Sequence, residues 1–206
     1  MKIISLIFGL FFMLPCIAQE SKNKTIDTAY ETFLSRVGKD TLVTYRSKEY
    51  KCSEDVFGIV GFYYEKEKLR LIEHTYKQGF YEDYTTEYYF MENDDLVMSC
   101  MLFKISHLNT YSYESKYQQK AGVEKVLELV EERMFFDKDT PVCYRRSYGT
   151  KVSEWDQDYF NSLDFEASNC NENVEDIRYK YRLLRKAEKR LLHTFRKGPA
   201  CIFHMW

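Results

Sequence analysis

Residues 57 to 103 read FGIVGFYYEKEKLRLIEHTYKQGFYEDYTTEYYFMENDDLVMSCMLF, and this stretch decides the fold. It holds four runs rich in β-branched, aromatic and Leu residues: FGIVGFYY, LRLIEHTY, YTTEYYFM and LVMSCMLF. Short polar connections at 65–68, 77–83 and 92–95 separate the runs. Each run is only about eight residues long, whereas an amphipathic helix needs its apolar spacing over ten or more. The pattern therefore predicts an antiparallel meander.

One helix is expected before the sheet in the sequence and a second helix after it. Residues 25–37 have the apolar spacing of a helix, which Gly38 can end. The apolar residues concerned are Ile26, Tyr30, Phe33 and Val37. Residues 174–196 form the second expected helix, with an apolar stripe. That stripe consists of Val174, Ile177, Tyr181, Leu184, Leu191 and Phe195.

A hairpin unit recurs along the chain, with an aromatic pair, a polar turn and a further strand. EYYFMENDDLVM matches the region 131–147 with an offset of 45. The matching pairs are Glu87 with Glu132, Phe90 with Phe135, Asp94 with Asp139, and Val97 with Val142. We expect Phe90 and Phe135 to occupy equivalent buried positions in two hairpins. The turns ENDD and DKDT lack the Asn-Gly or Asp-Gly pair that is usual in two-residue hairpin turns.

This arrangement of hairpins between an N-terminal and a C-terminal helix resembles a group of small exported bacterial proteins of unassigned function. The resemblance covers roughly residues 25 to 195 and implies a strongly twisted antiparallel sheet. Residues 122–132 fit either a helix or a strand, and the resemblance favours a strand over 124–136. The predicted fold class is α+β. It consists of a single twisted antiparallel sheet of about seven strands over 41–148, with the two helices, in one domain of residues 19–206.

The first eighteen residues, MKIISLIFGLFFMLPCIA, have the pattern of a secretory signal peptide. One Lys precedes an apolar run that is too short to span a membrane, and small residues end at Ala18. Cleavage after Ala18 would place the protein in the periplasm or outside the cell. Lipid attachment at Cys16 is an alternative, but Pro15 stands where a small residue is usual. No transmembrane segment is expected after removal of the signal.

Five cysteines remain after removal of the signal, and an oxidising compartment allows them to pair. We expect a disulfide between Cys170 and Cys201, and small buried residues on strands at Cys100 and Cys143. Zinc at Cys201, His204 and Cys170 is an alternative. It is disfavoured because only one ligand pair is closely spaced, so no metal site is predicted.

Charge is distributed unevenly near the C-terminus. Without the signal the chain has 29 basic and 32 acidic residues, which argues against a nucleic-acid partner. Residues 154–176 contain eight acidic and no basic residues, whereas 178–197 contain nine basic residues and one Glu. Arg182, Arg185 and Lys189 are therefore candidates for binding an anionic polymer or lipid headgroups, unless the acidic block covers them.

No catalytic signature is present, and no catalytic residue or cofactor is predicted. The favoured function is a non-catalytic binding or envelope-associated protein whose partner is an envelope protein or an anionic polymer. Its tyrosine-rich sheet surface or the polar 104–121 loop would provide the contacts. The tyrosines singled out for binding are Tyr84, Tyr88, Tyr111 and Tyr113. The alternative is a small extracytoplasmic hydrolase that uses carboxylates or His74.

Overall fold

A computed structural model of the chain describes residues 21–78, 84–108, 125–137, 140–170, 173–193 and 201. The chain divides into two compact units at residue 43. In the first unit residues 21–36 form a helix, in place of the predicted 25–37. Three of the four residues expected on its apolar face are buried: Ile26, Tyr30 and Phe33.

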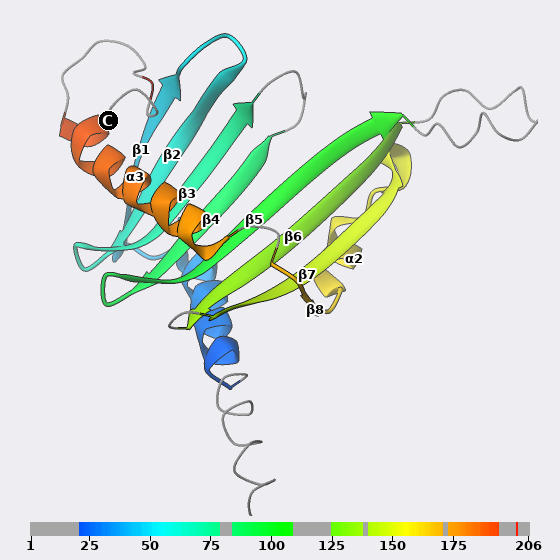
Figure 1. The fold of residues 1–206 in the computed structure, drawn as a ribbon, viewed down its shortest axis with the longest axis horizontal. Coiled ribbons are helices and arrows are strands. Elements are labelled where there is room, and N and C mark those ends of the chain that lie inside the picture. The colour runs from blue at the N-terminus through cyan, green and yellow to red at the C-terminus, as the bar shows by residue number, and fades with distance from the viewer. Residues whose placement is uncertain are drawn as a thin grey trace, which may run out of the picture. The chain divides into compact units, whose positions relative to one another are not determined.

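The second unit is built on one antiparallel sheet whose strands follow each other in sequence order (Figure 1). Its strands are β1 (Val43–Lys51), β2 (Val56–Glu65), β3 (Lys68–Gln78), β4 (Thr85–Glu92), β5 (Asp95–Leu108), β6 (Lys125–Asp137), β7 (Thr140–Lys151) and β8 (Glu166–Ser168). The predicted α+β class and meander are confirmed. The sheet has eight strands instead of about seven, because the short β8 pairs with β7.

The ambiguous segment before residue 137 is a strand. Strand β6 pairs with β5 from Lys125 to Phe135 and with β7 from Val126 to Asp137. Two full-length partners decide between helix and strand where the residue pattern alone does not. The polar loop predicted over 104–121 is wrong for 104–108, which belong to β5, and its remainder, with Tyr111 and Tyr113, lies outside the described residues.

The hairpin turns are tight although they lack glycine. Glu92 pairs with Asp95, and the two residues between them, Asn93 and Asp94, have φ values of 52° and 69°. Lys66 and Glu67 have positive φ values in the same way in the β2–β3 turn. Positive φ at both central residues is what the two-residue turns of twisted hairpins require, and Asn and Asp tolerate it best after glycine.

Phe90 and Phe135 are both buried, as expected. Phe90 pairs with Met98 of β5, which in turn pairs with Phe135 of β6. The two phenylalanines therefore lie in one row across the sheet and on the same face. Each stands two residues before the end of its strand, at the same distance from the turn.

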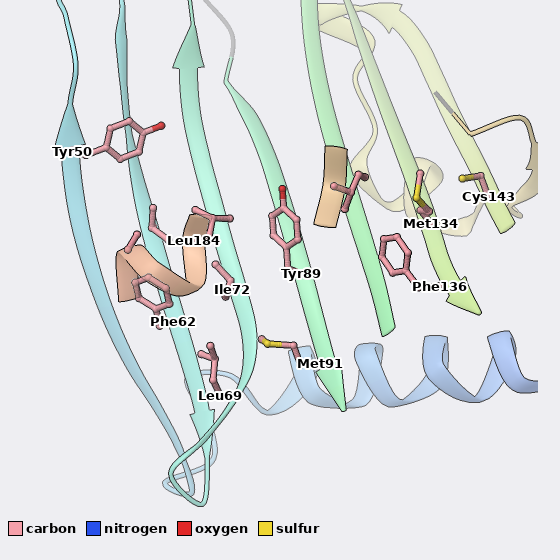
Figure 2. Packing of buried hydrophobic residues seen from close by; sticks show 13 residues of the cluster. Tyr50, Phe62, Leu69, Ile72, Tyr89, Met91, Met134, Phe136, Cys143 and Leu184 are labelled. Atoms are coloured by element: carbon pink, nitrogen blue, oxygen red, sulfur yellow. The ribbon is translucent and has the colours of Figure 1, made fainter. Parts of the chain in front are cut away.

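Helix α3 (Val174–His193) covers one face of the sheet, which we call the helix face (Figure 1). Ile177, Leu184 and Ala187 of α3 are buried in the main core cluster. The strands contribute alternate residues to it, among them Phe62, Ile72, Tyr89, Met91 and Met134 (Figure 2). Alternation along each strand sends their neighbours, such as Tyr63 and Tyr88, to the opposite side, which we call the tyrosine face.

The segment between β7 and β8 contains a 3-10 helix, η2 (Val152–Glu154), and a short helix, α2 (Gln157–Ser162). Asp156 caps α2 by accepting hydrogen bonds from the backbone N–H groups of Asp158 and Tyr159. Phe160 of α2 is buried, and the Arg146 guanidinium lies 4.7 Å from the centre of its ring. This acidic segment is thus anchored to the sheet through its aromatic side chains.

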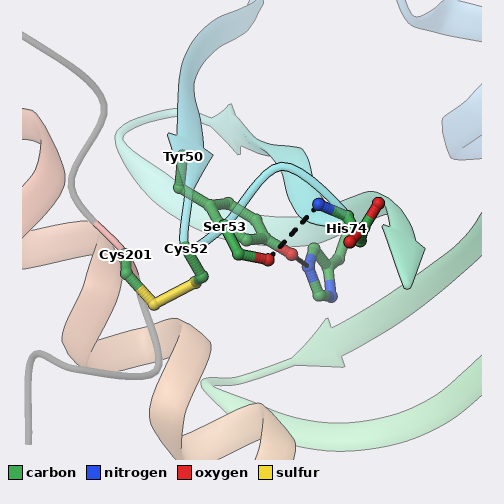
Figure 3. The surroundings of a disulfide bond; sticks show 6 residues. Tyr50, Cys52, Ser53, His74 and Cys201 are labelled. Atoms are coloured by element: carbon green, nitrogen blue, oxygen red, sulfur yellow. Dashed lines mark hydrogen bonds between the residues drawn. A yellow bond between two sulfur atoms is a disulfide. The ribbon is translucent and has the colours of Figure 1, made fainter. Parts of the chain in front are cut away.

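The expected Cys170–Cys201 disulfide is wrong, because each cysteine has another partner. Cys52 bonds to Cys201, with Cα atoms 4.4 Å apart (Figure 3). Cys143 bonds to Cys170, with Cα atoms 5.2 Å apart, so the expectation of an unpaired Cys143 is also wrong. The pairing of Cys143 with Ser168 in the sheet brings Cys170 within disulfide distance of β7. Cys100 is a buried thiol on β5.

Among the described residues, no helix is long and apolar enough to cross a membrane.

Candidate functional site

A carboxylate, Glu87 of β4, is buried on the helix face at the centre of a polar cluster. Its Oε2 accepts a hydrogen bond from the Tyr89 hydroxyl at 2.7 Å and faces His74 Nδ1 at 3.5 Å. Its Oε1 accepts from the Tyr76 hydroxyl at 3.0 Å and from Lys180 Nζ at 3.1 Å. Three strand residues and one residue of α3 thus satisfy this carboxylate.

His74 extends the cluster to β1. Its Nε2 lies 2.9 Å from the Tyr50 hydroxyl, and Tyr50 is buried (Figure 3). The hydroxyl reaches this position because residue 58 on β2 is glycine: a Cβ at Gly58 would lie 2.9 Å from it. With a proton on Nδ1, the imidazole would accept from Tyr50 and face Glu87 with its N–H.

The groups around Glu87 keep its carboxyl group ionised. Burial by itself raises the pKa of this carboxyl, but the hydrogen bond and charge of His74, the Lys180 ammonium and the Tyr89 hydroxyl outweigh it and leave the pKa at about 2. Burial, followed by the nearby Glu87 charge, raises the pKa of Tyr50 above its ordinary value. The phenol of Tyr50 therefore stays protonated, as a hydrogen-bond donor.

The order Tyr50, His74, Glu87 matches that of a nucleophile, a base and an orienting acid. The geometry argues against such a use. Tyr50 and His74 are both buried, and the cavity beside Glu87 measures about 10 Å³, which is room for one water molecule. The raised pKa of Tyr50 also disfavours the phenolate that would attack. The arrangement suits the attachment of α3 to the sheet better than catalysis.

A second buried carboxylate, Glu131 of β6, lies on the tyrosine face. Arg133 donates to its Oε1 at 2.6 and 2.8 Å, and Arg146 of β7 donates to its Oε2 at 2.6 and 2.8 Å. Both guanidinium groups lie within 4.6 Å of the centre of the Phe165 ring. The Cys100 thiol lies 3.5 Å from Glu131 Oε1. This cluster holds the segment after β7 against the sheet.

The tyrosine face carries an exposed tyrosine of β1, Tyr45, next to the partly buried Tyr63 of β2. The ring of Tyr45 lies over Gly61, where a Cβ would come within 2.8 Å of it, and 4.6 Å from the ring of Tyr63. Tyr45 is nevertheless 50% exposed, so about half of its surface is accessible to solvent. The Tyr63 hydroxyl donates to Glu73 Oε2 at 2.5 Å, which fixes the ring beneath Tyr45.

A groove of about 390 Å³ opens on this face near the start of β4. Its lining is mostly apolar, and Tyr84, 48% exposed, stands edge-on to Phe57 at 6.2 Å between ring centres. The other residues that line it are Glu49, Tyr50, Lys51, Gly58, Ile59 and Thr75. The lining has one acidic side chain, Glu49, and one basic side chain, Lys51, so its formal net charge is zero.

Two of the four tyrosines predicted for binding, Tyr84 and Tyr88, lie on this face. Tyr88 is partly buried; burial raises its pKa first, and the charge of Glu73 adds to the effect. Of the basic candidates on α3, Arg182 and Lys189 are exposed. Arg185, the third basic candidate, is half-buried: its Nη1 lies 3.3 Å from the Tyr181 hydroxyl and 3.7 Å from Met91 Sδ.

Sequence reasoning missed Glu87, Lys180 and Tyr45. The one available signal for Glu87 was its position, two residues before Tyr89 on the inward side of a strand. Lys180 follows the same rule, three residues after the inward-facing Ile177. Within the described ranges, no three His, Cys, Asp or Glu side chains come together as metal ligands.

No protein-family model, curated protein or solved structure matches this chain. The resemblance to small exported proteins with aromatic hairpins therefore stays a prediction. The fold and the two faces of its sheet are the basis for an argument about function.

Proposed function

We propose that this chain is an exported, non-catalytic binding protein whose ligand is a neutral oligosaccharide held on the tyrosine face. The observation that carries the proposal is the open, apolar groove at Tyr84, on the same face as the flat ring of Tyr45. A protein that leaves hydroxyl-bearing rings exposed on a sheet offers both a planar apolar surface and hydrogen bonds. Pyranose rings have the matching combination of an apolar face and hydroxyl groups.

Charge and dimensions support a neutral, extended ligand. The groove has one acid and one base, Glu49 and Lys51, so no ion of either sign is preferred. Tyr84 directly precedes β4, and the partly exposed Tyr88 lies about 13 Å further along on the same face, so an extended ligand could reach from one to the other. The two disulfides of the structure fit an extracellular location, which supports the signal-peptide prediction.

The hydrolase alternative has weaker support. Its predicted base, His74, is buried between Tyr50 and Glu87. In the part of the chain that the structure describes, the groove at Tyr84 contributes only one carboxylate, Glu49. Hydrolysis of a glycosidic bond generally uses a pair.

The test is a calorimetric titration of the purified protein with soluble hexasaccharides of β-linked glucose and of β-linked N-acetylglucosamine. We expect binding of at least one of them, weakened about fivefold in Tyr84→Ala, because a stacked ring contributes about 1 kcal/mol. Tyr159→Ala is the matched control, since Tyr159 of α2 is 50% exposed. The absence of binding up to about 10 mM sugar, or an equal loss in the control, would reject the proposal.

A further inference from the structure

Helix α3 has an outward side that the sheet does not use. Four exposed residues follow it at spacings of three and four, and we call them the basic ridge: Tyr179, Arg182, Lys186 and Lys189. This spacing places them on one side of the helix. Tyr179 is 55% exposed, among the most exposed large hydrophobic residues described. The buried Ile177 and Leu184 fix the other side of α3 to the sheet.

The remaining charged residues between 177 and 189 have partners of their own: Arg178 Nη1 lies 3.3 Å from Oε1 of Glu175, in the first turn of α3. Lys180 reaches Glu87, and Arg185 lies between Tyr181 and Glu188, whose Oε2 is 3.4 Å from Arg185 Nε. Glu188 is the single acidic residue of this stretch, and it also accepts a hydrogen bond from Tyr64 at 2.7 Å. No carboxylate between residues 177 and 189 therefore lies on the ridge; the exposed Glu175, four residues before Tyr179, lies at its N-terminal end and pairs with Arg178.

The acidic segment that precedes α3 in the sequence is anchored on the other face. Phe160 and Phe165 stack with Arg146, and Trp155 packs on Tyr148 at 5.2 Å. The described part of this segment is thus engaged with the tyrosine face of β6 and β7, while the ridge belongs to the helix face. The described residues 154–170 of the acidic block are therefore anchored on β6 and β7, whereas Glu175 lies on α3 itself and pairs with Arg178.

We propose that the basic ridge docks the protein on a bilayer surface that contains anionic lipid headgroups. Lys and Arg side chains near such a surface are attracted to it, each by about fivefold in binding constant. A tyrosine among them suits the boundary between headgroups and water, because its ring is apolar and its hydroxyl is polar. The outer side of a helix is convex and can meet a flat surface along its length, whereas a single polymer strand is better held in a groove.

The inference is independent of the sugar groove, since it uses the other face of the sheet. It also differs from general attraction to anions, because the whole chain has a formal net charge of −2. Only a local excess of positive charge can account for binding to an anionic surface.

The experiment is flotation of the purified protein with vesicles of phosphatidylcholine alone or with about one third phosphatidylglycerol, at low salt. We expect binding to the anionic vesicles only, and a loss of at least tenfold when the salt is raised to about 0.15 M. The double variant Arg182→Glu with Lys189→Glu should bind at least about thirtyfold more weakly. Tyr179→Ser should weaken binding by a smaller factor without changing the salt dependence.

The matched control is Lys68→Glu with Lys104→Glu, which makes the same change in net charge at two exposed positions on the sheet. It should bind the anionic vesicles like the wild type. Equal losses in both double variants would overturn the proposal, and so would equal binding to both kinds of vesicle. Heparin serves as the soluble polyanion: binding to it without binding to the vesicles would assign the ridge to a polymer and reject the bilayer.

Discussion

The two faces of one sheet each bury a carboxylate, and they hold it differently. Glu131 receives four hydrogen bonds from Arg133 and Arg146, two residues of the sheet itself. Glu87 receives its bonds from two tyrosines and from Lys180, which belongs to α3. The first carboxylate therefore joins neighbouring strands, and the second joins the sheet to a separate helix. A buried glutamate thus connects β6 with β7 on the tyrosine face, and another connects α3 with the sheet on the helix face.

The largest effect is expected from Glu131→Leu. Without the carboxylate, two guanidinium groups remain in a buried site with no compensating charge, so the free energy of unfolding should fall by about 3 to 5 kcal/mol. Urea denaturation measures it. Glu166→Leu, at an exposed carboxylate on β8, is the control and should stay within about 0.5 kcal/mol of the wild type. A variant of Glu131 as stable as the control would mean that water or other groups compensate the arginines.

An intermediate effect is expected from acid, through Glu87. Its pKa is about 2 in the folded protein against an ordinary value of 4.5, so it contributes stability above pH 4.5 that is lost as the pH falls towards 2. The shift corresponds to about 3 kcal/mol. Unfolding free energies measured from pH 6 to pH 2 should therefore fall less steeply in Glu87→Gln than in the wild type. Parallel curves would show that Glu87 is not the responsible group.

The smallest effect is expected from Lys180→Met. Lys180 is partly exposed, so its ion pair with Glu87 is screened by water and should contribute only about 1 kcal/mol to the free energy of unfolding. Arg182→Met removes an equal charge from the outward side of the same helix and should change stability by less than about 0.5 kcal/mol. If the two variants unfold at the same urea concentration, α3 is held by its apolar contacts alone.

Much of the fold could be predicted because its signals are local. Four runs of strand-forming residues with short polar connections lie within 57–103, and consecutive antiparallel strands need no further information to pair. Strand β8 could not be predicted, since the sequence EAS is too short for a pattern and becomes a strand only by pairing with β7. The cysteine pairing failed for a similar reason, because spacing alone does not determine connectivity.

The buried clusters were harder to predict than the strands. Glu87 is one acid among many in the sequence, and its partner Lys180 is 93 residues away. Nothing near residue 87 indicates that a lysine of a distant helix will reach it. The exposure of Tyr84 follows from its place in a connection, directly before β4. A side chain whose contacts lie near it in the sequence can be identified from the sequence. A side chain whose contacts form only in the folded protein cannot.

The Cys52–Cys201 bond joins residues 149 positions apart, whereas Cys143 and Cys170 are only 27 apart. Cys52 can form its bond only after the chain up to Cys201, 149 positions further on, has been synthesised. Cys143 and Cys170, which bond to each other, are synthesised before Cys201. Because closing a short loop costs less chain entropy, the Cys143–Cys170 bond has the advantage in forming first. We therefore expect the Cys52–Cys201 bond, which closes the longer of the two loops, to form second, with Cys52 available to other thiols until then.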